Sequence, residues 1–184
     1  MEMNFLTILL KKCLTVKKRY DIIIIEREVI IMRDTKWIWF DMDGTIADLY
    51  GVEGWLEDLQ RFDTRPYAEA KALYNPYELL EILFELKCQG YNLGVISWGS
   101  KANNEDYDRK VAEVKNKWLA ENFLDLLLDK VIVTPYGVRK ADTCRPYGKG
   151  ILVDDEEQNR NEWDLGDTIN ANLNIIDNLK KLVA

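Results

Sequence analysis

Short apolar runs alternate with longer amphipathic segments from residue 37 to the end of the chain. The runs lie at residues 37–40, 92–97, 131–134 and 151–153, and a weaker run lies at 168–171. Runs of this length, bounded by polar or glycine-containing segments, are typical of strands that are buried on both faces of a parallel sheet. We therefore predict four central strands and a weaker fifth.

The segments between these runs show helical periodicity. Residues 55–62 predict a short amphipathic helix, whereas residues 63–72 are less regular. A helix start is predicted at Asn75, because Asn can cap a helix, Pro76 fits its first position and Glu78 follows three residues after the cap. Gly90 marks the end of this helix. Strands that alternate with helices predict an α/β fold with right-handed crossovers.

Two further helices are predicted, at residues 107–119 and 174–182. The first has one apolar face, and we interpret its opposite, charged face as a solvated surface. That charged face carries Asp108, Lys110, Glu113 and Lys117.

The composition indicates one globular domain and restricts its chemistry. The chain has 184 residues, a net charge of −7 and no histidine. The acidic balance argues against an extended nucleic-acid surface, and the lack of histidine excludes Ser-His-Asp catalysis and most zinc sites. Cys13, Cys88 and Cys144 show no CxxC spacing, so we interpret them as reduced thiols of a cytoplasmic protein. Cys144 is placed in a predicted polar loop.

Residues 1–31 differ from the remainder, and we predict that they form an extension outside a domain at residues 32–184. The apolar stretch Phe5–Leu10 is too short to span a bilayer, and basic residues follow it, unlike in a secretory signal. Arg27-Glu28-Val29 can be encoded by a purine-rich stretch that resembles a ribosome-binding site shortly before Met32. One hypothesis is that translation starts at Met32, and the alternative is an added strand or hairpin at residues 20–31. Neither reading gives the extension a catalytic role.

Two pairs of aspartates carry the candidate chemistry. Asp41 and Asp43 follow the first predicted strand, and Asp154 and Asp155 follow the fourth. Ligands bind at the carboxyl ends of strands in open α/β sheets, so neighbouring strands would bring these carboxylates together. Because such a group repels itself unless a cation holds it, the pattern favours a hard divalent metal, Mg²⁺. One carboxylate can also attack phosphorus as a nucleophile while another handles protons.

Ser97 and a lysine complete the set. Ser97 ends the second predicted strand, where its hydroxyl can bond a phosphate oxygen. Lys140 follows the third predicted strand and can neutralise the same group. Lys149, in Gly148-Lys149-Gly150, is the alternative lysine.

These residues resemble, in their order along the chain, the four motifs of the haloacid dehalogenase-like phosphohydrolase superfamily. The matching residues are Asp41-Met42-Asp43-Gly44-Thr45, Ser97, Lys140 and Asp154-Asp155. The resemblance covers about residues 36–183. It implies a Rossmann-like, three-layer α/β/α fold with a central parallel sheet, and a phosphatase that works through an aspartyl phosphate.

The resemblance also implies roles for these residues. Asp41 would be the nucleophile and a metal ligand, and Asp43 would be the general acid and base, with its backbone carbonyl on Mg²⁺. Ser97 and Lys140 would hold the phosphoryl group. Asp154 and Asp155 would bind the metal, directly or through water. Thr45 and Asn159 are the expected neighbours that hold these ligands in place.

The spacing of the motifs bears on the substrate. Too few residues separate the motifs for a full cap domain, so we predict a minimal cap around residues 51–65 and an open site. The order Ser97, Lys115–Leu119 and Lys140 resembles 5′(3′)-deoxyribonucleotidases, which favours a small phosphorylated substrate such as a nucleotide. Trp98 is a candidate for stacking on a base. The alternatives are a polynucleotide end phosphatase and a non-catalytic module that binds phosphate or a partner.

Overall fold

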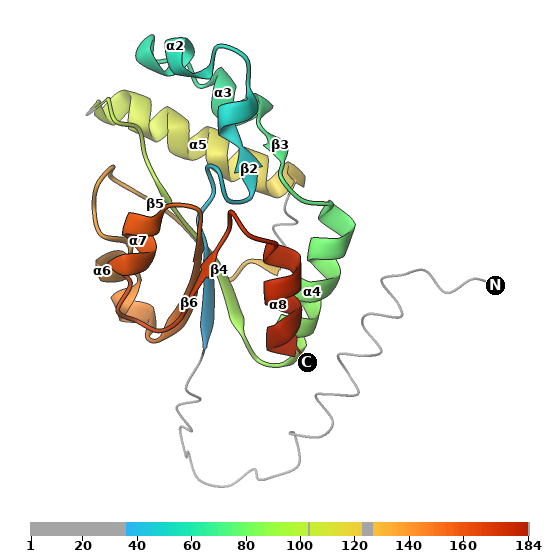
Figure 1. Cartoon of the computed structure of the whole chain (residues 1–184). Coiled ribbons are helices and arrows are strands. Elements are labelled where there is room, and N and C mark those ends of the chain that lie inside the picture. Colours follow the sequence, from blue (N-terminus) through green and yellow to red (C-terminus); the bar gives the residue numbers. More distant parts are fainter. Residues whose placement is uncertain (1–35, 103, 123–126, 184) are drawn as a thin grey trace, which may run out of the picture.

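Five parallel strands form the central sheet of the computed structural model, which describes residues 36–102, 104–122 and 127–183 (Figure 1). The sheet order is β5-β4-β1-β6-β7, which places the first strand in the middle. The α/β class, the parallel sheet and its strands are therefore as predicted. The bounds are β1 (Trp37–Phe40), β4 (Asn92–Trp98), β5 (Lys130–Thr134), β6 (Gly150–Asp154) and β7 (Thr168–Asn170).

Both faces of the sheet are buried, because alternate side chains of each strand point to opposite sides. Ile38 and Phe40 of β1 belong to one large apolar cluster, and Trp37 and Trp39 belong to another. This is why the run Trp37–Phe40 is apolar at every position rather than at every second one. The result is the three-layer arrangement of helices, sheet and helices.

The helices cover the two faces in separate groups (Figure 1). Those on the side of Phe40 are α4 (Pro76–Cys88), the C-terminal half of α5 (Glu105–Asn122) and α8 (Ile175–Val183). Those on the side of Trp39 are α6 (Lys140–Cys144), the short 3₁₀ turn η3 (Arg145–Tyr147) and α7 (Glu157–Asn161). The predicted cap of α4 is present, since the Asn75 side chain accepts a hydrogen bond from the Tyr77 N–H.

A small segment at residues 47–72, which we call the cap segment, packs on the N-terminal half of α5 beyond the end of the sheet (Figure 1). Its elements are β2 (Ala47–Asp48), η1 (Leu49–Gly51), α2 (Trp55–Gln60), α3 (Arg65–Glu69) and β3 (Lys71–Ala72). Residues 63–72, whose sequence pattern is less regular, nevertheless contain regular structure. The segment forms α3 and a strand that pairs with β2, because buried Tyr67 fixes it against α5.

Close packing between two central strands predicts a sensitive position at Gly94. A Cβ atom on this residue would lie 2.4 Å from the ring of Trp39, which is fully buried. We expect Gly94→Ala to lower the free energy of unfolding by about 1–3 kcal/mol, because overpacked cores must displace side chains or backbone. Denaturant unfolding measures this, and an unchanged midpoint would show that the ring can move aside.

The predicted extension at residues 1–31, together with Cys13, lies outside the described residues. None of the helices in the described parts of the chain combines the length and apolar character that crossing a bilayer requires.

Candidate active site

Asp41 and Asp154 lie beside each other because they follow paired residues of neighbouring strands. Phe40 of β1 is opposite Val153 of β6, and the N–H of Asp41 donates to the Val153 carbonyl at 2.8 Å. This point is at the carboxyl end of the middle of the sheet, where ligands bind in open α/β folds. The two aspartate pairs therefore follow adjacent strands, which is the condition under which the sequence pattern would bring carboxylates together.

Three carboxylates form what we call the acidic cluster: Asp41, Asp154 and Asp155. One oxygen from each lies within 4.8 Å of the others. Asp41 and Asp154 are buried, with 6% and 0% of their surface exposed, and Asp155 is partly buried. An all-oxygen set of this kind could hold a hard divalent ion. The side chain of Asp43 is not part of this cluster.

Neighbouring side chains hold the cluster in place. The Thr45 hydroxyl donates to Asp155 Oδ1 at 3.0 Å and accepts from the Asp155 N–H at 3.0 Å. Asn159 Nδ2 donates to both carboxylate oxygens of Asp154, at 3.2 and 3.1 Å. Gly44 has φ +82°, and a Cβ there would lie 2.6 Å from Asp155 Oδ2, so only glycine lets the loop approach this carboxylate.

The two candidate lysines lie at opposite ends of the sheet. Lys140, the first residue of α6, is buried and donates to Asp41 Oδ1 at 2.6 Å and to Asp154 Oδ2 at 2.7 Å. Lys149 is exposed and precedes β6, where its carbonyl accepts from the Trp37 N–H. Lys140 is therefore the lysine that contacts the acidic cluster.

The charges of the cluster are not balanced by Lys140 alone. Burial and the charge of Asp41 raise the pKa of Asp154, and burial followed by the charges of Asp41 and Asp154 raises the pKa of Asp155 to about 6. Burial would lower the pKa of Lys140, but Asp41 and Asp154 outweigh it and leave the pKa above its ordinary value. A further cation beside these oxygens would favour their charged forms. The charge balance of the cluster is therefore compatible with a bound metal ion, and so is its all-oxygen ligand set.

Asp43 and Ser97 meet around a different lysine. Lys115 Nζ donates to Asp43 Oδ2 at 2.5 Å and to Ser97 Oγ at 2.9 Å. Burial raises the pKa of Asp43, although the Lys115 charge opposes this. The structure thus divides the predicted residues into two groups, one around Lys140 and one around Lys115.

Lys115 is a site residue that the sequence analysis named only within the stretch Lys115–Leu119, without a role of its own. It shares one face of α5 with Val111, Trp118 and Leu119, all of which are buried. A lysine within an apolar stripe needs a buried acidic partner, and that spacing is the signal that could have identified it.

Two other sequence expectations need correction. Asp108 is not on a fully solvated face, because its carboxylate accepts from the Ser100 N–H at 2.8 Å and from the Ser100 hydroxyl at 2.6 Å. Lys110, Glu113 and Lys117 are exposed as predicted. Cys144 does not lie in a polar loop: it is fully buried in α6, and burial raises the pKa of its thiol to about 12.

A pocket of about 510 Å³ opens above these groups, between the cap segment and the carboxyl end of the sheet. Asp41, Asp43 and Lys140 line it, so both groups of site residues reach the same space. Much of the remaining wall is aromatic, with Tyr50, Trp55, Phe62, Tyr67, Trp98 and Tyr136. The predicted cap at residues 51–65 supplies part of this wall, and Tyr67 of α3 extends it beyond the predicted end.

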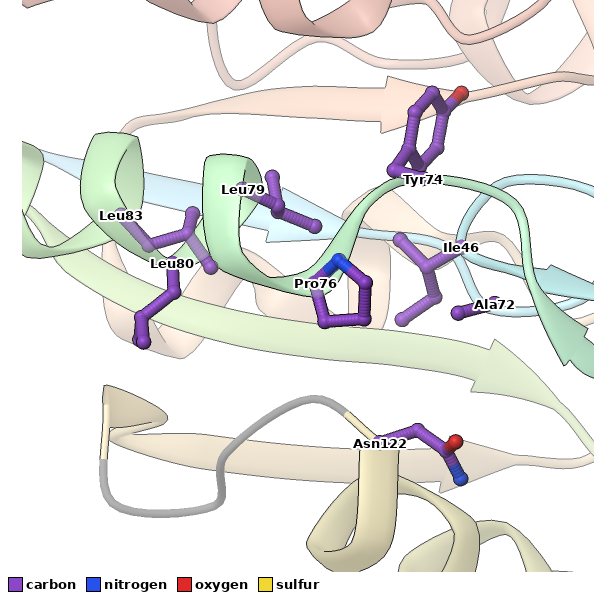
Figure 2. Close-up of a pocket in the computed structure, with 8 residues that line it drawn as sticks. All are labelled: Ile46, Ala72, Tyr74, Pro76, Leu79, Leu80, Leu83 and Asn122. Carbon is purple, nitrogen blue, oxygen red and sulfur yellow. The ribbon is translucent and has the colours of Figure 1, made fainter.

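A second hollow has no such chemistry (Figure 2). It lies between Ile46, Ala72, Tyr74 and the start of α4, and its volume is about 20 Å³, little more than one water molecule needs. Its lining carries no carboxylate or cation. The larger pocket is therefore the candidate site.

Comparison with models of known protein families gave no match, and a search of curated proteins gave none either.

Proposed function

We propose that the protein is a Mg²⁺-dependent phosphomonoester hydrolase that works through an aspartyl phosphate, as its motifs' resemblance to haloacid dehalogenase-like phosphohydrolases implies. The observation that carries the proposal is the acidic cluster itself. Its three carboxylates lie together, Asp41 is bonded to Lys140, and these two residues line a pocket that is also lined by a further acid, Asp43. A site that only binds phosphate has no need of that additional acid.

In the proposed reaction, Asp41 attacks the phosphorus of the substrate. Lys140 holds Asp41 Oδ1, so the other oxygen of this carboxylate forms the new O–P bond. The bond to the leaving alcohol breaks, and Asp43 gives that oxygen a proton. Asp43 then takes a proton from water as the water attacks the phosphorus, which releases inorganic phosphate and restores Asp41.

Mg²⁺ is the cofactor that we propose for the acidic cluster. The side chains of Asp41, Asp154 and Asp155 would hold it, and the backbone carbonyl of Asp43 is the further ligand that the resemblance implies. When bound, the ion would neutralise charge on the transferring phosphoryl group.

The pocket favours a small substrate with a planar aromatic group, and we propose a nucleoside monophosphate. The aromatic wall offers faces on which a base can stack. Among the described residues that line the pocket, Lys101 is the one cation besides Lys140. This charge pattern supports one phosphoryl group near Lys140 better than the backbone of a polynucleotide.

A phosphatase screen tests the proposal. The full chain is offered nucleoside monophosphates, sugar phosphates and 5′-phosphorylated oligonucleotides, each with Mg²⁺ and with a chelator. We expect Mg²⁺-dependent release of phosphate, with the highest kcat/KM for a nucleoside monophosphate. Preference for the oligonucleotides would favour an end phosphatase, and no release from any substrate would favour a binding module.

Stacking predicts a specific role for Trp98. We expect Trp98→Leu to lower kcat/KM for a nucleoside monophosphate by about tenfold or more, since a base stacked on an aromatic ring contributes roughly 1–3 kcal/mol. The Trp98 ring also lies 5.1 Å from Lys140 Nζ, so the value is compared with that for a sugar phosphate, which shares any effect through Lys140. The control is Tyr77→Leu. Tyr77 is an aromatic residue that does not line the pocket, and 76% of its surface is exposed. Equal losses for both substrates would exclude stacking on Trp98.

A further inference from the structure

Lys115 places a charged group in the interior and uses all three of its donors there. The residue is 0% exposed. Its ammonium donates to Asp43 Oδ2 at 2.5 Å, to Ser97 Oγ at 2.9 Å and to the Trp98 carbonyl at 2.7 Å. An ammonium has three N–H groups, so each one has an acceptor.

These contacts join parts of the chain that are distant in sequence. Asp43 belongs to the loop after β1, whereas Ser97 and Trp98 end β4. The ring of Tyr67, from α3 of the cap segment, lies 4.9 Å from the same ammonium. Lys115 is therefore at the junction of the acid-bearing loop, the end of β4 and the cap segment.

Burying an ammonium is unfavourable unless a charged partner and further hydrogen bonds compensate for the lost water. In this protein the compensation comes from residues to which the proposed reaction gives roles. Lys140 is bonded in the same way to Asp41 and Asp154. The two buried lysines thus serve different groups, one the nucleophile and the acidic cluster, the other the acid and the serine.

Resting on the proposed function, we propose that Lys115 is a positioning residue that fixes the Asp43 carboxylate and the Ser97 hydroxyl for phosphoryl transfer. Lys115 holds Oδ2 of Asp43, which leaves Oδ1 to meet the oxygen of the leaving alcohol. Ser97 Oγ accepts from Lys115, so the hydrogen of Ser97 is directed to another acceptor, a phosphoryl oxygen. Lys115 acts through these two residues and does not need to touch the substrate.

The dependence of the rate on the leaving group tests this role. A nucleoside 5′-monophosphate releases an alkoxide that needs a proton, whereas 4-nitrophenyl phosphate releases a stable phenolate that does not. We expect Lys115→Met to lower kcat/KM for the nucleotide by about 100-fold or more, because a positioned general acid contributes roughly 10²–10⁴-fold. The loss for 4-nitrophenyl phosphate should be much smaller. A purely structural role would lower both values alike.

Two further variants separate positioning from other effects. Lys117→Met is the matched control, since this lysine is on the same helix with its side chain 75% exposed, and it should retain both rates. Adding Lys115→Met to Asp43→Asn should lower the nucleotide rate little further, because residues that act as a unit are not additive.

If Lys115→Met does not fold, as thermal unfolding would show, Lys115→Arg replaces it. This variant keeps the charge, but its planar guanidinium cannot repeat the three contacts. We expect Lys115→Arg still to lower kcat/KM for the nucleotide more than kcat/KM for 4-nitrophenyl phosphate. The difference between the two losses should be smaller than in Lys115→Met.

The outcomes distinguish this inference from the function on which it rests. A wild-type chain that hydrolyses none of the substrates would overturn both. An active wild type in which the Lys115 variants lose both rates equally, or in which the double variant loses a further tenfold or more, would overturn the role of Lys115 and leave the proposed phosphatase intact.

Discussion

Replacing Asp41 with asparagine is expected to lower the turnover of the best phosphomonoester on the order of 10⁴-fold or more, as loss of a catalytic nucleophile commonly does. A neutral amide cannot form the aspartyl phosphate on which the proposed reaction depends. The fold should survive, because the amide oxygen can still accept from Lys140, which also keeps its bond to Asp154. Steady-state kinetics with saturating Mg²⁺ and thermal unfolding measure the two effects.

A second measurement identifies the intermediate directly. Acid quenching of the wild-type chain during turnover of a substrate labelled in its phosphoryl group should leave label on the protein, and the Asp41→Asn chain should carry none. Asp106→Asn is the control, because its side chain is 79% exposed on the surface of α5. Full turnover by Asp41→Asn would remove Asp41 from the mechanism, whatever the screen shows.

The sheet could be predicted because its strands are buried on both faces. Trp37–Phe40 and Gly150–Asp154 have side chains in two apolar clusters, so nearly every position is apolar and the pattern is unambiguous. The start of α4 was equally clear, since the Asn75 side chain itself forms the cap. In these elements, local chemistry and tertiary packing favour the same conformation.

The cap segment could be predicted only in part, because few of its side chains are buried. No residue of α2 is buried, and α3 is fixed by Pro66 and Tyr67. Its partner is the N-terminal half of α5, a contact that depends on tertiary packing rather than on any local pattern. Short elements held by a few distant contacts lack the periodicity that sequence analysis detects.

The candidate site divides in the same way. The approach of Asp41 to Asp154 follows from strand order, because residues that directly follow paired positions of adjacent parallel strands must be neighbours. No such rule predicts the pairing of Lys115 with Asp43, because this pairing joins α5 to a loop 72 positions earlier in the chain. The sequence therefore predicted the residues that follow the strands closely, whereas the role of Lys115 depends on a contact between distant parts of the chain.

Binding of Mg²⁺ to the acidic cluster is expected to stabilise the folded protein, and Asp154→Asn should remove most of that effect. Free ligand at 100 times its Kd stabilises a protein by about 2.7 kcal/mol. For a chain of this size, each kcal/mol of stabilisation raises the unfolding temperature by roughly 2–4 °C. The effect should decrease as the pH falls through about 6, because the Asp155 carboxyl then becomes protonated and a protonated carboxyl is a poor metal ligand. Thermal unfolding with MgCl₂, against NaCl of equal ionic strength, measures the shift without any assay of activity.

The Asp154→Asn variant distinguishes binding of Mg²⁺ at the acidic cluster from a general effect of salt. Asp154 is 0% exposed, and its carboxylate also accepts from Asn159 and from the Glu156 N–H, so the Mg²⁺ shift of the variant is measured from its own unfolding temperature without the ion. Glu157→Gln removes an exposed acid of the same segment and should retain the full Mg²⁺ shift. If Asp154→Asn responded to Mg²⁺ as the wild type does, the ion would bind elsewhere, and the acidic cluster would have to act on phosphate through Lys140 alone. Hydrolysis that continues undiminished in the presence of a chelator would lead to the same conclusion by an independent route.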